Sequence, residues 1–75
     1  MFNVISNIIM EIRGENQPIE LGSSLRNDIG LTSLDMMMLI AQLENEYNIN
    51  LSTEHFANIE TVADLVSIVE RTKDS

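Results

Sequence analysis

Apolar residues recur at intervals of three and four at the start of this chain, and this spacing predicts an amphipathic helix. Asn3, Asn7 and Glu11 would face outward, and Gly14 is the expected end of the helix. The buried face would consist of Phe2, Ile5, Ile8, Ile9 and Ile12. No stretch of the chain alternates with period two, so a sheet is not expected.

Three more helices are expected further along the chain. The second runs from about Ser33 to Tyr47, a short third lies near Ser52 to Ala57, and the fourth begins at Thr61. Residues expected to face the core are Leu39, Ile40, Leu43, Tyr47, Leu51, Phe56, Val62, Leu65, Val66 and Val69. The 75 residues are enough for one domain, residues 1–75. The sequence therefore predicts an all-α four-helix bundle with a short third helix and a long first loop.

The starts of two helices carry the spacing of a capping box, a hydroxyl residue followed three positions later by an acid. Thr32 with Asp35 has this spacing, and Thr61 with Asp64 repeats it. Ser33 could instead cap the second helix, because helix boundaries read from a sequence are uncertain by a few residues.

A long loop separates the first two predicted helices. Residues 15–32 contain Gly22, Gly30 and the only proline, Pro18, which is loop composition. The apolar residues expected to hold this loop against the core are Ile19, Leu21, Leu25 and Ile29. So long a loop in so small a domain is often functional.

Composition excludes several classes of function. The chain has no cysteine, which removes disulfides, thiolate zinc sites and cysteine nucleophiles. Its apolar runs are too short to cross a bilayer, and its N-terminus lacks the features of a signal peptide. The net charge of −8 disfavours nucleic acid and anionic lipid and favours basic protein patches. We expect a monomeric cytoplasmic protein with no nucleic-acid or membrane partner.

Catalytic and metal-binding patterns are lacking. His55 is the only histidine, and no nucleophile or phosphate loop accompanies it. A calcium loop starting at Asp28 would need oxygen ligands at its third and fifth positions, glycine at the sixth and glutamate at the twelfth. Those positions hold Gly30, Thr32, Ser33 and Leu39, so the match fails. Neither catalysis nor a metal site is expected.

Three consecutive methionines, Met36 to Met38, stand near the start of the second predicted helix. Consecutive helical residues point about 100° apart, so the three cannot all face the core. At least one should be exposed beside Ser33, and we expect two. Exposed methionines suit surfaces that bind several partners.

The run "DIGLTSLD", residues 28–35, resembles the attachment motif of acyl carrier proteins, typically Asp-Leu-Gly-x-Asp-Ser-Leu-Asp. The segments "LENEY" and "IETVADL" resemble the later helices of that family, at the expected distance from the motif. The resemblance implies that Ser33 carries 4'-phosphopantetheine, transferred from coenzyme A by a magnesium-dependent phosphopantetheinyl transferase. It also implies a non-catalytic protein that presents thioesters to acyl-loading and acyl-processing enzymes with basic docking patches.

The resemblance also assigns partner-binding positions. These are Leu34, Asp35, Met37, Met38, Ala41, Glu44, Glu46 and Ile59, with Ile59 near where cargo can enter the interior. Four positions depart from the family's pattern. Thr32 replaces an acid, Met36 a small polar residue, Met38 a glutamate and Ala41 a larger apolar residue. The implied partner surface is less acidic and more apolar beside Ser33, as for a specialised carrier.

Three functions stay open at this stage. The first is an acyl carrier of fatty-acid synthesis or of a specialised biosynthetic pathway. The second is an aminoacyl or peptidyl carrier of a non-ribosomal-type pathway, against which the acidic second helix argues mildly. The third is an unmodified helical adaptor that binds through the methionines, a role for which Ser33 would be unnecessary.

Overall fold

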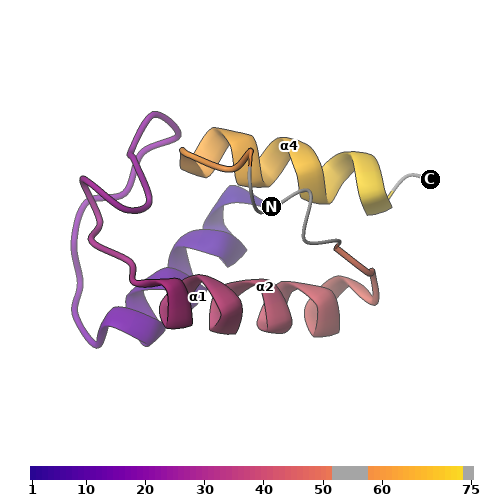
Figure 1. Ribbon diagram of the computed structural model, residues 1–75, viewed down its shortest axis with the longest axis horizontal. Coiled ribbons are helices and arrows are strands. Elements are labelled where there is room, and N and C mark those ends of the chain that lie inside the picture. Colours follow the sequence, from indigo (N-terminus) through magenta and orange to yellow (C-terminus); the bar gives the residue numbers. More distant parts are fainter. Residues whose placement is uncertain (52–57, 74–75) are drawn as a thin grey trace.

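The first helix, α1, comprises Phe2–Arg13 and ends where the sequence pattern predicts. Gly14 has the left-handed backbone conformation, with φ of 72°, and its N–H donates to the carbonyl oxygen of Met10. Glycine adopts this conformation without the steric cost that a side chain would bring. Figure 1 shows the computed structural model, which describes residues 1–51 and 58–73.

The second helix, α2, comprises Ser33–Tyr47. Asn48 ends it in the left-handed conformation, and the Asn48 N–H donates to the carbonyl oxygen of Glu44. Asparagine is among the few residues besides glycine that adopt this conformation readily. The helix therefore begins and ends as predicted.

The last helix, α4, comprises Val62–Lys73. The predicted capping box is present at its start, because the Asp64 N–H donates to Thr61 Oγ1 and the Thr61 N–H donates to Asp64 Oδ2. The Glu60 N–H donates to the same carboxylate oxygen. The short helix expected near Ser52 to Ala57 lies outside the described residues, as do His55 and Phe56.

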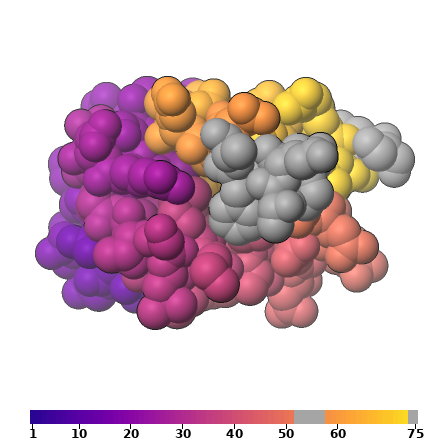
Figure 2. Space-filling model, in the orientation of Figure 1, coloured from indigo at the N-terminus to yellow at the C-terminus, as the bar shows by residue number. Residues whose placement is uncertain are grey.

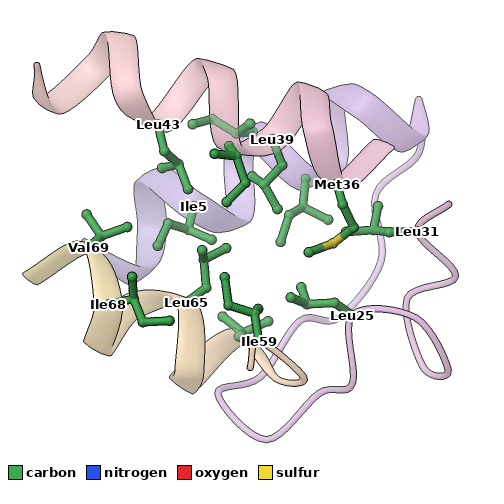
Figure 3. Close-up of a cluster of buried hydrophobic side chains, with 14 of the residues drawn as sticks. Ile5, Leu25, Leu31, Met36, Leu39, Leu43, Ile59, Leu65, Ile68 and Val69 are labelled. Atoms are coloured by element: carbon green, nitrogen blue, oxygen red, sulfur yellow. The ribbon is translucent and has the colours of Figure 1, made fainter. Parts of the chain in front are cut away.

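One hydrophobic core lies between the three helices. In Figure 1, α2 and α4 run in the same direction, and α1 lies behind them and packs against both. Figure 3 shows side chains from all three helices and the loop pointing into one space. Its buried members are Ile5, Ile8, Ile9, Leu25, Ile29, Leu31, Met36, Leu39, Ile40, Leu43, Leu51, Ile59, Val62, Leu65, Ile68 and Val69.

The core largely agrees with the predicted faces, with a few differences. Leu31 and Ile68 are buried although they were not among the expected core residues. Leu21 was expected to hold the loop on the core, and this prediction is wrong because the side chain is 51% exposed. The backbone of Leu21 makes the contact instead, since its carbonyl oxygen accepts from the Ala63 N–H at 2.8 Å.

The long loop is joined to the start of α4 by backbone hydrogen bonds. The Leu25 N–H donates to the Glu60 carbonyl at 2.9 Å, and the Val62 N–H donates to the Ser23 carbonyl at 3.1 Å. These bonds surround an isolated antiparallel bridge between Ser24 and Thr61. It is the only β pairing among the described residues, which agrees with the expected all-α class. The loop forms one end of the molecule in Figure 1.

The described residues have a Cα radius of gyration of 11.2 Å, close to the roughly 11 Å expected for a compact chain of this length. None of their helices is long and apolar enough to span a bilayer.

Candidate functional site

Thr32 is the N-cap of α2, which decides between the two residues that could cap the helix. The Asp35 N–H donates to Thr32 Oγ1 at 3.1 Å, and the Thr32 N–H donates to Asp35 Oδ2 at 3.0 Å. Both halves of the capping box are therefore formed. The hydroxyl that starts the helix belongs to Thr32, and the Ser33 hydroxyl is not needed for this purpose.

Ser33 is the first residue of α2, and its side chain is exposed. Within the described part of the chain, no hydrogen bond involves the Ser33 hydroxyl or the N–H groups of Ser33 and Leu34. The first N–H groups of a helix have no acceptor inside the helix, and the helix dipole places partial positive charge there. Such a position suits a phosphate group.

The backbone before Ser33 is held in place by neighbouring elements. Gly30 has φ of 85°, a conformation that favours glycine. A side chain on Gly30 would begin 3.8 Å from the Arg13 guanidinium, so the end of α1 lies against this turn. Leu31 is buried next to it, and its N–H donates to the Leu25 carbonyl at 2.9 Å. Ser33 therefore follows a segment, Gly30 to Thr32, whose backbone is fixed by contacts with α1 and the long loop.

The exposed apolar residues of α2 share one face of the helix. Leu34 is 64% exposed, Met37 61% and Met38 39%, and Ala41 is also exposed. Their spacing of three, four and seven places them together beside Ser33. We call Leu34, Met37, Met38 and Ala41 the apolar patch. In Figure 2, atoms of α2 form the lower part of the face in view.

Met36 lies on the opposite side of α2 and is only 2% exposed. Figure 3 shows its thioether directed toward the loop residues Leu31 and Leu25. Two of the three methionines are therefore exposed, as predicted. Met36 adds nothing to the apolar surface beside Ser33.

The acidic residues predicted to bind partners differ in their surroundings. Asp35 is partly buried, and its carboxylate accepts the capping hydrogen bond. Glu44 Oε2 accepts from the Leu51 N–H at 2.8 Å, which joins α2 to the segment that follows it. Glu46 is exposed. Ile59 is buried in the core, so its side chain faces the interior and does not lie on the surface that a partner would contact.

Two features at the site were not found from the sequence. The contact of Arg13 with Gly30 joins residues distant in the chain, and no local pattern signals it. The hydrogen bond from the Leu51 N–H to Glu44 joins residues seven positions apart, and its donor lies beyond the end of α2 at Tyr47. Among the described residues, no group of three or more histidine, cysteine, aspartate or glutamate side chains could hold a metal ion.

The family model for the phosphopantetheine attachment site matches residues 3–69 of this chain. The chain is therefore a carrier domain of the class to which phosphopantetheine is attached. Acyl carrier proteins are among its similar sequences. That of Exiguobacterium sibiricum is 31% identical over 70 residues, covering 93% of this chain and 89% of the relative. That of Coprothermobacter proteolyticus is 34% identical over 71 residues, covering 93% and 87%.

Solved structures agree with this assignment. A Mycobacterium tuberculosis protein assigned as an acyl carrier protein superposes with a TM-score of 0.88 at 32% identity, covering 92% of this chain and 93% of that chain. The holo acyl carrier protein of Geobacter metallireducens has the same fold, with a TM-score of 0.81 at 21% identity, covering 95% and 83%. The chain belongs to the acyl carrier protein family, whose members are carriers and not catalysts.

Proposed function

We propose that residues 1–75 act as one discrete carrier domain and that Ser33 is the residue to which 4'-phosphopantetheine is attached. The observation that carries this proposal is the exposed Ser33 hydroxyl at the first position of α2, directly after the Thr32 cap. Because Thr32 supplies the capping oxygen, modification of Ser33 leaves the hydrogen bonds that start the helix in place.

The residues around Ser33 fit a phosphodiester. The N–H groups of Ser33 and Leu34 are available to phosphate oxygens, and the positive end of the α2 dipole lies at the same point. The bound arm supplies a terminal thiol that holds the cargo as a thioester, a reactive sulfur that the cysteine-free chain lacks. The protein's own part is to position the arm and to present an exposed hydroxyl to a phosphopantetheinyl transferase.

The apolar patch is the surface that we propose for partner enzymes. Its residues follow Ser33 on one face, so an enzyme that contacts the patch would also reach the arm. Asp35 and Glu46 add negative charge on α2, which would attract basic docking patches on acyl-loading and acyl-processing enzymes. Met38 is exposed where the family's pattern has a glutamate. This surface is therefore more apolar than that pattern, which favours specialised partners over those of housekeeping fatty-acid synthesis.

An aminoacyl or peptidyl carrier is the second candidate function, since such carriers resemble acyl carriers in fold and attachment residue. The acidic residues of α2 weigh against it. An unmodified adaptor that binds through the apolar patch is a third. The free Ser33 hydroxyl weighs against the adaptor, because binding through Leu34, Met37 and Met38 would not need it.

Intact mass spectrometry tests the attachment residue. The purified chain is incubated with coenzyme A, magnesium and a broad-specificity phosphopantetheinyl transferase. We expect wild type and a Ser67→Ala control to gain one phosphopantetheine, since Ser67 is an exposed serine on α4, and Ser33→Ala to gain none. Absence of any gain in wild type with several transferases would leave the adaptor as the better interpretation.

The holo protein then distinguishes the two kinds of carrier. Loading is measured with fatty-acyl and with aminoacyl donors, each with its own loading enzyme. An acyl carrier should accept the fatty-acyl group at the faster rate. Faster aminoacyl loading would favour the peptidyl-type carrier.

A further inference from the structure

An open groove of about 750 Å³ lies between α1 and α2. It is lined by α1, by the residues that follow Gly14, and by the later turns of α2. None of its lining residues belongs to the apolar patch. The first of them on α2, Gln42, stands about one turn beyond Met38. The groove is therefore a second surface, turned toward α1, that adjoins the proposed docking face and shares Glu46 with it.

Both apolar and amide side chains line the groove. Val4, Ile8 and Met10 supply apolar surface from α1, and Asn7, Gln42 and Asn45 supply side-chain amides from both helices. Each amide has both a donor and an acceptor, so the set can pair with the N–H and C=O groups of an extended peptide. A simple cation would use only the oxygens.

The charge of the groove is negative. Glu11, Glu15 and Glu46 line it, and no lysine or arginine does. Glu15 pairs with Arg13 at 3.8 Å, whereas Glu11 and Glu46 have no ion pair within the described ranges 1–51 and 58–73. Carboxylates on opposite helices would attract a positively charged segment from both sides and repel nucleic acid.

From the groove, its amides and its unpaired carboxylates, we propose that the space between α1 and α2 binds an extended, basic segment of a partner protein. The segment would place lysine or arginine side chains beside Glu11 and Glu46 and small apolar side chains over Ile8. This goes beyond the role of Ser33. It gives the carrier a second contact, through which a partner with a basic tail would bind more tightly than one lacking it.

Nuclear magnetic resonance of the ¹⁵N-labelled apo protein tests this with defined peptides. The probe is the acetylated and amidated peptide Lys-Val-Lys-Val-Lys, and the neutral control peptide has glutamine in place of each lysine. We expect saturable shifts in the side-chain amides of Asn7, Gln42 and Asn45 with the basic peptide only. Equal binding of the neutral peptide, or shifts centred on Leu34, Met37 and Met38, would overturn the proposal.

Two variants and a matched control separate the groove from general charge attraction. Glu11→Lys should weaken binding of the basic peptide about tenfold, because attraction becomes repulsion at one side of the groove. Glu20→Lys makes the same charge change at an exposed position of the long loop and should stay within about twofold of wild type. Equal weakening by the two would overturn the proposal.

Asn45→Lys gives a second test from α2 if Glu11→Lys fails to fold, and it should weaken binding in the same direction. The experiment uses apo protein and does not involve Ser33. A negative result in it is therefore distinguishable from a failure of phosphopantetheine attachment.

Discussion

The hydroxyl groups of Thr32 and Ser33 are adjacent in the chain but have different uses. Thr32 Oγ1 accepts from the Asp35 N–H and caps α2, whereas the Ser33 hydroxyl makes no hydrogen bond among the described residues. Helix initiation and the proposed attachment thus depend on different atoms. This separation makes the contributions of the two residues measurable one at a time.

Removal of the Thr32 hydroxyl should lower stability, whereas removal of the Ser33 hydroxyl should abolish attachment. Thr32→Ala should lower the free energy of unfolding by about 1 kcal/mol, the usual cost of losing a cap. Ser33→Ala should change it by less than about 0.5 kcal/mol while abolishing attachment. Urea unfolding of the apo proteins measures the two changes in the free energy of unfolding, and intact mass spectrometry measures attachment. A larger loss of stability in Ser33→Ala than in Thr32→Ala would show that Ser33 is the working cap.

The three methionines should separate into one core residue and two surface residues. Met36→Ala removes a side chain that is only 2% exposed and should cost about 2–5 kcal/mol in urea unfolding. The double variant Met37→Glu with Met38→Glu should retain helix content and melting temperature nearly unchanged, yet slow transfer of cargo by partner enzymes. A large loss of stability in the double variant would place those two residues in the core.

At the scale of elements, each of the two later helices starts with a threonine and an aspartate three residues on. In α4 the Asp64 carboxylate accepts from the N–H groups of both Thr61 and Glu60. These backbone hydrogen bonds stabilise the charged form and lower the pKa of Asp64 below its ordinary value of 3.8. The start of α4 is therefore sensitive to acid.

The stabilising effect of Asp64 should depend on pH. Because its pKa is lowered in the folded state, its contribution is fully present above the ordinary pKa of 3.8 that it has in the unfolded chain. The contribution is lost as pH falls through the lower folded value. Above about pH 5, Asp64→Asn should be less stable than wild type by about 0.3–1 kcal/mol, the usual effect of a negative charge at a helix start. Urea unfolding from about pH 2.5 to about pH 7 covers the range in which this carboxylate titrates. The difference in stability between Asp64→Asn and wild type should shrink toward acid. A gap that widens toward acid would contradict this.

The helices were predictable because the signals for them are local. Apolar spacing, Gly14, and the Thr32 and Thr61 caps each act within a turn or two of the residues they organise. The exposure of Leu21 and the bond from Leu51 to Glu44 depend on contacts between segments. The periodicity of apolar residues within one segment does not indicate contacts between segments. Neither feature was therefore predicted from the sequence. At the site, the position of Ser33 and the exposure of two methionines followed from local pattern, but the position of Arg13 did not.

At the scale of the whole molecule, the loop and α4 are joined at one end by backbone hydrogen bonds. The carbonyls of Ser23 and Leu21 accept from the N–H groups of Val62 and Ala63. The first N–H groups of a helix ordinarily have no protein acceptor. Here the loop supplies acceptors for α4, whereas Ser33 and Leu34 of α2 have none within the described part of the chain.

Hydrogen exchange should reveal this difference between the two helix starts. We expect the backbone N–H groups of Val62 and Ala63 to exchange more slowly than those of Ser33 and Leu34, although all four lie in the first turn of a helix. Amide exchange followed by nuclear magnetic resonance measures each rate, corrected for the intrinsic rate of the local sequence. Similar protection at both helix starts would mean that the loop separates readily from α4.

The capping role of Thr32 has a consequence for how such carriers can diverge. Aspartate and threonine both cap helices well, so the residue before Ser33 can alternate between them with little effect on folding. What changes is one unit of charge beside the proposed attachment residue. Sequence drift at this position can therefore adjust which enzymes a carrier attracts, and the adjustment does not have to be matched by compensating changes in the core.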